Sequence, residues 1–161
     1  MNNDKALREH LSEALKGEGA HAGFDDAVSG IEPAKRGTRP PGAAHSPWEV
    51  IEHLRIAQGD ILAFTRNDPH YAPADFPSGY WPKSPEPPDA GAWDASVAAF
   101  RADLKAFREL VEDESNDLLA PLPQSSSGAS IMAQALLTAD HNAYHLGELL
   151  VVRRLLGQWS G

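Results

Sequence analysis

The chain has 161 residues and no cysteine, and its 23 acidic and 14 basic residues give a formal net charge of −9. This length fits a single domain over residues 1–161, and the lack of cysteine excludes disulfides, thiolate metal ligands and a cysteine nucleophile. The acidic charge argues against nucleic acid and anionic membranes as partners, because both are bound mainly through basic residues. The N-terminus lacks the apolar core of a signal peptide, and no apolar stretch approaches the roughly 20 residues of a membrane span. We therefore expect a cytoplasmic protein.

Four segments have apolar residues every three or four positions, which predicts amphipathic helices, and little of the chain is typical of strands. The first helix is expected over residues 2–16, and a short one around residues 24–29. The next long helix should begin at residues 46–49 (SPWE), because this sequence forms a capping box with proline at the first helical position. It should end near Asn67, since Pro69 follows.

Residues 67–90 contain seven prolines in 24 positions, together with Phe76, Tyr80 and Trp81. An extended segment of this length can run along a whole helix. We therefore predict a crossover that makes the second and third long helices parallel, with aromatic side chains packed on the bundle.

The remaining long helices are expected over residues 91–114 and 128–156, with Gly157 as a C-terminal stop. Together the segments predict an all-α fold, a four-helix bundle with a long Pro-rich crossover between helices 2 and 3. The last helix is apolar on all sides near its end, which predicts that a second subunit covers one face in a homodimer. The apolar residues are Leu146, Leu149, Leu150, Val151, Val152, Leu155 and Leu156.

Three histidines form the strongest candidate site. His141 and His145 are four residues apart on the last helix, so their rings share a face, and His53 flanks the apolar stripe of the second long helix. Such a set suits one divalent ion, zinc, nickel, iron or copper, with open coordination positions. Alternatively, Asp140, Asn142 or backbone groups satisfy the buried imidazoles, which would each cost about 1–3 kcal/mol without a partner.

Glu148 lies one turn beyond His145 on the same face. It is a candidate catalytic residue, a general acid or base near the metal, or a support for a ligand. The alternatives are a solvated carboxylate or an ion-pair partner of Arg55 or Arg101.

Several neighbouring residues are ambiguous. Asp60, seven residues after His53, can orient an imidazole, but we expect it to have a surface role. The other histidines, His10, His21, His45 and His70, lie in the first predicted helix or in loops and are assigned no role, although His45 stands out because it is next to the cap. Four aromatic residues can line a pocket over the metal or belong to the core, namely Trp48, Tyr80, Trp81 and Tyr144.

Other chemistries lack their motifs. The chain has no G-x-S-x-G nucleophile, no P-loop and no dinucleotide fingerprint in a strand–turn–helix context. Paired E-x-x-H motifs of di-iron bundles are also missing. Haem is disfavoured because two histidines on one helix face cannot occupy opposite axial positions.

Three segments resemble the DinB-like (DinB/YfiT) superfamily. They are HSPWEVIEHLRIAQGDIL (45–62), GYWP (79–82) and ADHNAYHLGELLVVRRLLGQW (139–159). The resemblance implies a four-helix bundle with a long crossover, dimers, and a metal site that maps to His53, His141 and His145. It also implies a class that includes metal-dependent thiol S-transferases and isomerases using low-molecular-weight thiols such as bacillithiol or mycothiol.

Two functions remain open. The first is a metal-dependent enzyme of thiol S-transferase or hydrolase type, with one divalent ion (zinc, nickel or iron), a small-molecule substrate and a low-molecular-weight thiol as co-substrate. The second is a non-catalytic, stress-associated structural dimer in which the ion only joins two helices.

Overall fold

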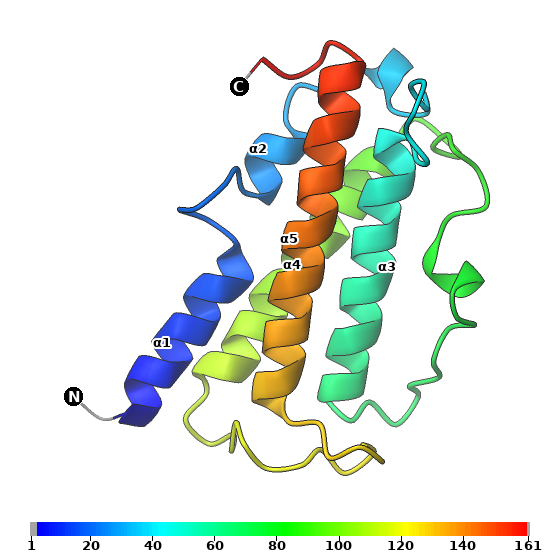
Figure 1. Cartoon of the computed structure of the whole chain (residues 1–161). Coiled ribbons are helices and arrows are strands. Elements are labelled where there is room, and N and C mark those ends of the chain that lie inside the picture. The colour runs from blue at the N-terminus through cyan, green and yellow to red at the C-terminus, as the bar shows by residue number, and fades with distance from the viewer. Residues whose placement is uncertain (1–2, 161) are drawn as a thin grey trace.

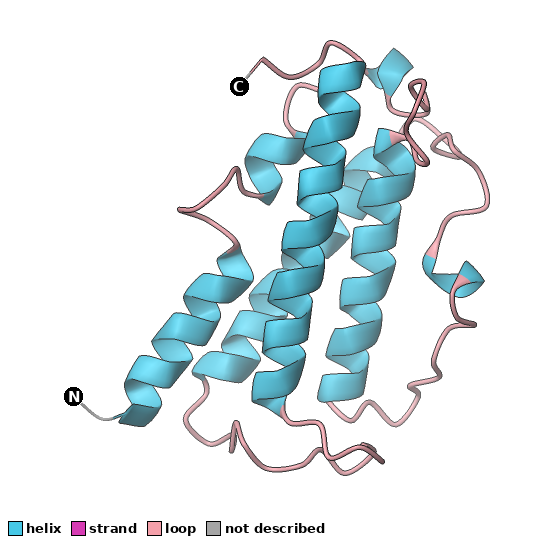
Figure 2. Ribbon diagram, in the orientation of Figure 1, coloured by secondary structure: helices cyan, strands magenta, loops and turns pink. Residues whose placement is uncertain are grey.

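The computed structural model describes residues 3–160, which form helices joined by turns and loops (Figure 1 and Figure 2). The predicted all-α class is confirmed, since these residues contain no strand and only one isolated bridge. None of the helices is long and apolar enough to cross a membrane. The α-helices are α1 (Asn3–Lys16), α2 (Phe24–Val28), α3 (Pro47–Thr65), α4 (Ala92–Glu112) and α5 (Ile131–Leu155), and the short 3-10 turns are η1 (Pro33–Lys35) and η2 (Ser78–Tyr80).

The helix boundaries agree with the sequence patterns except at the start of α5. Asn2, where the first helix was expected to begin, lies outside the described residues. The predicted start of α5 at Gly128 is wrong, because that residue has φ +77°, a turn conformation, and the helix begins only at Ile131. The Ser130 hydroxyl caps the helix by accepting a hydrogen bond from the Ala133 N–H at 3.3 Å.

The start of α3 is fixed by the predicted capping box. The Ser46 hydroxyl accepts from the Glu49 N–H at 3.2 Å, and the Glu49 carboxylate accepts from the Ser46 N–H at 2.9 Å. Arg39 donates to the same carboxylate from Nε at 2.7 Å. The first turn of α3 is thus held firmly, and His53 follows in its second turn.

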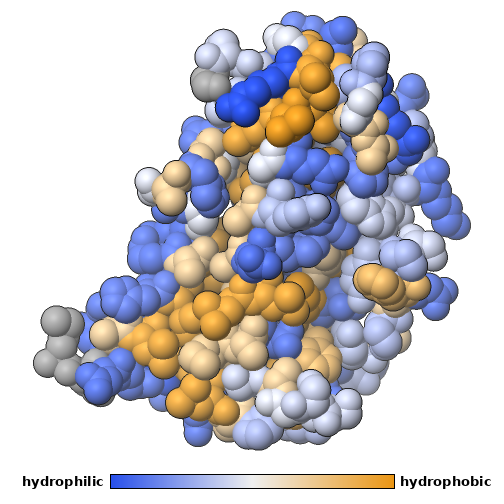
Figure 3. All heavy atoms as spheres, in the orientation of Figure 1, coloured by the Kyte–Doolittle hydropathy of each residue, from blue (hydrophilic) through white to orange (hydrophobic). Residues whose placement is uncertain are grey.

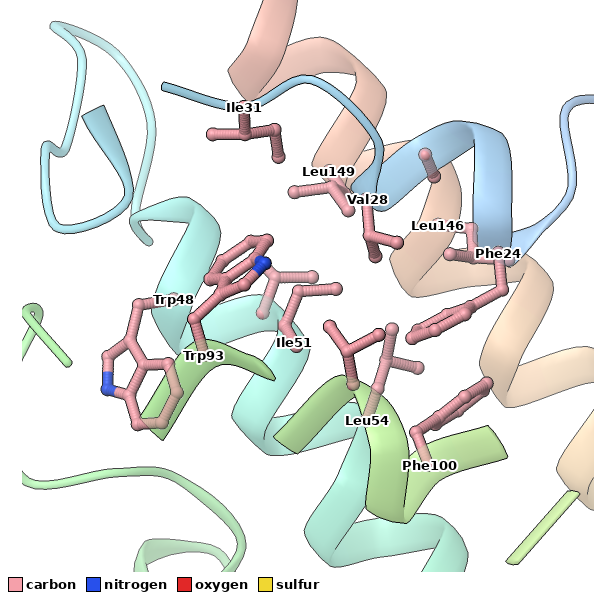
Figure 4. Packing of buried hydrophobic residues seen from close by; sticks show 13 residues of the cluster. Phe24, Val28, Ile31, Trp48, Ile51, Leu54, Trp93, Phe100, Leu146 and Leu149 are labelled. Atoms are coloured by element: carbon pink, nitrogen blue, oxygen red, sulfur yellow. The ribbon is translucent and has the colours of Figure 1, made fainter. Parts of the chain in front are cut away.

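The apolar core forms two clusters, one toward each end of the long helices. α3 packs against α4 and α5, and α1 packs against the same two helices. Figure 4 shows the cluster to which α2 contributes: it contains Phe24, Ala27, Val28, Ile31, Trp48, Val50, Ile51, Leu54, Trp93, Val97, Phe100, Leu146 and Leu149. The cluster that includes α1 contains Leu11, Leu15, Leu62, Phe107, Val111, Leu118, Leu122, Ile131 and Ala135.

A buried polar link joins three helices close to the histidines. Gln58 of α3 is fully buried, donates from Nε2 to the Phe100 carbonyl at 2.8 Å and accepts from Asn142 Nδ2 at 2.9 Å. Because both amides need these partners, the link fixes the register of α3 against α5. The Asn142 side chain thus donates to Gln58 and also acts on His141, whose pKa it raises, so the sequence-based alternative of Asn142 as a partner of a buried imidazole stays open.

The segment from residue 66 to 91 runs along the outer side of α3, from the end of that helix back toward its beginning (Figure 1). α4 then starts beside the beginning of α3, so the two helices run in the same direction. Among the contacts that hold the segment to the α3 region, Ser46 Oγ donates to the Pro85 carbonyl at 2.6 Å, and His53 Nδ1 lies 2.8 Å from the Tyr80 carbonyl oxygen.

The apolar end of α5 is only partly covered by the chain itself. Leu146, Leu149 and Val152 are buried, whereas Val151 and Leu155 are 51% and 53% exposed. Figure 3 shows hydrophobic surface over this end of α5. The expectation that a second subunit covers this face stays a prediction.

Candidate metal centre

The three predicted ligand histidines meet between α3 and α5. The Nε2 atom of His53 lies 3.1 Å from Nε2 of His141 and 3.1 Å from Nε2 of His145. His53 and His145 are buried, and His141 is partly buried. One ligand nitrogen of each ring lies within 4.8 Å of the others, an arrangement able to hold a metal ion.

The outer hydrogen bonds of two rings determine where their protons lie. His53 Nδ1 faces the Tyr80 carbonyl at 2.8 Å, and His145 Nδ1 faces the Glu148 carboxylate at 2.8 Å. Both partner oxygens can only accept, so each Nδ1 carries the proton and each neutral ring has a lone pair at Nε2. When both rings are neutral, these two lone pairs face each other across 3.1 Å. A cation is the partner that removes this repulsion.

The spacing fits a metal ion bound by several imidazoles. Tetrahedral zinc–imidazole bonds of about 2.0–2.1 Å place two nitrogens about 3.3–3.4 Å apart, slightly more than the 3.1 Å from His53 Nε2 to each of the other two Nε2 atoms here. His141 Nδ1 is buried without a hydrogen-bond partner among the described residues. Three imidazoles suit zinc, nickel, iron or copper and leave coordination positions for other ligands.

Burial keeps the rings in the form that binds metals. It lowers the pKa of His141 to about 4, and repulsion from His145 and His53 acts in the same direction. Burial also lowers the pKa of His53, more than the hydrogen bond to Tyr80 raises it. Both rings are therefore neutral near pH 7, and a neutral imidazole is the metal ligand.

A second layer of side chains supports the triad. Glu148 bridges two histidines, because its Oε1 lies 2.7 Å from His45 Nδ1 while its Oε2 holds His145. The Trp81 ring stacks on both His45 and His53, with centroid distances of 3.9 Å in each case. Sequence reasoning assigned His45 no role, and its position beside the cap of α3 was the one available signal.

Glu148 acts on the triad through His145. Burial by itself would raise the pKa of Glu148, but hydrogen bonds from His145 and His45 outweigh it, so the pKa lies below its usual value. Arg55 and Arg101, considered as its partners, pair with other carboxylates. Glu148 does not line the cavity described next, and this position suits a residue that orients a ligand.

A cavity of about 590 Å³ opens beside the histidines. Tyr80 and Trp81 line it, whereas Trp48 belongs to the core and Tyr144 is 73% exposed outside it. Asp60 also lines the cavity and is partly buried. The complete lining is His53, Ala57, Asp60, Ile61, Phe64, Tyr71, Phe76, Pro77, Tyr80, Trp81, Gln134, Leu137, His141 and His145.

A sequence model described as the DinB superfamily matches residues 18–149, and the chain therefore belongs to this superfamily. The match spans all three histidines and Glu148, and it confirms the resemblance seen in the sequence. No curated protein and no solved structure matches the chain significantly.

We expect Glu148→Gln to weaken metal binding about 10- to 100-fold, the usual effect of losing a partner that orients a metal-binding histidine. The glutamine keeps the size of the side chain but removes the negative charge that fixes the proton on His145 Nδ1. Competition with a chromophoric chelator measures the affinity. Glu52→Gln is the matched control, because the Glu52 carboxylate pairs with Arg55. Equal affinity in Glu148→Gln and native protein would contradict this role.

Proposed function

We propose that His53, His141 and His145 bind one divalent ion, and that this centre activates a small thiol or water in the adjacent cavity. The reaction type is thiol S-transfer or hydrolysis. The observation that carries the proposal is the 3.1 Å separation of two Nε2 atoms whose rings hold their protons on the opposite side.

Each residue around the centre has a definite task. The three imidazoles hold the ion, while the Tyr80 carbonyl and Glu148 keep two of the rings in the binding tautomer. When bound, the ion supplies a positive charge that lowers the pKa of a thiol or water, for a zinc-bound water to about 7.

The cavity favours an enzyme over a purely structural metal site. A structural ion would only need to join α3 to α5, and structural zinc sites have no open position. Here the nitrogens face a cavity large enough for a small molecule. A low-molecular-weight thiol is the co-substrate that we propose, from the chain's resemblance to thiol-using members of the superfamily. Zinc, nickel and iron all suit the donor set.

The finer fold assignment also belongs to this proposal. We take α1, α3, α4 and α5 as a four-helix bundle, and residues 66–91 as the crossover that allows α3 and α4 to run in the same direction. Cytoplasmic location stays a prediction from the sequence.

Thiol transfer tests the proposed activity directly. Metal-loaded protein is mixed with a panel of small thiols and a chromogenic electrophile, and formation of the thioether is followed by absorbance. We expect turnover in the native protein, none in His145→Ala, and native turnover in His21→Ala, which removes an exposed histidine remote from the triad. Equal rates for native, His145→Ala and chelator-treated protein would contradict a metal-dependent reaction.

We also propose that α5 forms a homodimer interface. Leu137, Tyr144, Val151 and Leu155 are exposed and lie along one face of the helix. Gly147 lies near the centre of this stripe, and a side chain there would meet nothing within 4 Å in the same chain. A two-fold axis near Gly147 would let two α5 helices pair antiparallel, with each half of the stripe facing the other half.

Light scattering tests this interface. We expect native protein at twice the chain mass of 17.4 kDa. Gly147→Glu should be monomeric yet folded, because the new side chain meets open space within its own chain but places two carboxylates at the axis. Ala98→Glu, at an exposed position of α4, is the matched control and should remain dimeric. A native monomer at micromolar concentration would contradict the interface.

A further inference from the structure

The cavity extends well beyond the histidines along one face of α3. His53, Ala57, Asp60 and Phe64 all line it, at the three- or four-residue spacing of a helix face. With a rise of 1.5 Å per residue, Asp60 lies about 10 Å along the helix from His53. A ligand that reaches both ends must therefore be elongated.

The two ends of the cavity differ in chemistry. Three imidazoles form one end, and between the ends the walls are mainly apolar, with Ala57, Ile61, Leu137 and Pro77 among them. The single carboxylate of the lining belongs to Asp60, which accepts hydrogen bonds from the Tyr71 and Tyr80 hydroxyls, and Phe64 and Phe76 also line the cavity. No lysine or arginine lines the cavity in the described part of the chain.

Asp60 is an anion without a cationic partner within residues 3–160. Its Oδ2 accepts hydrogen bonds from the Tyr80 hydroxyl at 3.0 Å and the Tyr71 hydroxyl at 3.4 Å. Burial raises the pKa of Tyr80 to about 12, with the hydrogen bond to Asp60 as the next cause, so the phenol keeps its proton and remains a donor. Oδ1 of Asp60 accepts no hydrogen bond from the described residues and is available to a ligand.

We propose that this end of the cavity binds a protonated amine. A carboxylate supplies a charge-assisted hydrogen bond to an ammonium group, and aromatic faces attract the same cation. The ligand is thus an elongated molecule with an ammonium group at Asp60, an apolar middle, and its reacting group at the histidines. The placement of the reacting group rests on the proposed function, whereas the amine site rests on Asp60 and the aromatic rings.

If Asp60 has only a structural role, removing its charge should not change which ligands the cavity binds. In that case the carboxylate only anchors residues 66–91 to α3 through the two tyrosine hydroxyls. Asp60→Asn separates these roles, because the amide oxygen still accepts from Tyr71 and Tyr80 while the negative charge is gone. Asp60→Ser is the second variant, should the asparagine protein fail to fold.

The experiment measures binding of three phenylalkyl probes of equal length, an amine, an alcohol and a carboxylic acid, by calorimetry on chelator-treated protein at pH 7. We expect the amine to bind about tenfold or more tightly than the acid, the usual size of one charged hydrogen bond. The preference should vanish in Asp60→Asn and persist in Asp94→Asn, which removes one exposed carboxylate outside the cavity. Equal binding of the three probes, or an amine preference that survives in Asp60→Asn, would overturn the inference.

This result is independent of the metal, because the protein is stripped before the titration. An amine preference in a protein that transfers no thiol would refute the proposed thiol transfer and leave the amine site standing. Thiol transfer without any amine preference would refute the amine site alone.

Discussion

The meeting of three imidazole nitrogens between α3 and α5 is the constraint on which the rest of the structure depends. Two Nε2 lone pairs at 3.1 Å repel each other unless a cation lies near them, and their protons are held on the opposite side of each ring. The helices must keep a fixed register for the rings to meet. The buried Gln58–Asn142 hydrogen bond and the capping box at Ser46 provide that register, one at each side of His53.

The path of residues 66–91 also determines the surroundings of the three histidines. This segment supplies the Tyr80 carbonyl that orients His53 and the Trp81 ring that stacks on His53 and His45. It also closes one side of the cavity, so the wall that shields the histidines forms the ligand site as well. With an ion bound, the cavity would be positive at the histidines and negative at Asp60. This difference in charge would favour one orientation of an elongated ligand in the cavity.

Local patterns in the sequence predicted the parts of the site that lie on single helices. The capping box placed the start of α3, and the four-residue spacing placed His141 beside His145. His45 and Asp60 escaped this reasoning because their contacts depend on where residues 66–91 cross α3, which no local pattern specifies. His45 contacts Glu148 and Trp81, which both contact the triad, and Asp60 faces a cavity that residues 66–91 help to form.

Elemental analysis of tag-free purified protein beside His145→Ala tests the central claim most directly. The account predicts about one equivalent of zinc, nickel or iron per chain, lost in the variant. No metal in either protein, even after reconstitution with each ion, would contradict it. The facing lone pairs of His53 and His145 would then need a different partner, and the cavity a function without a metal.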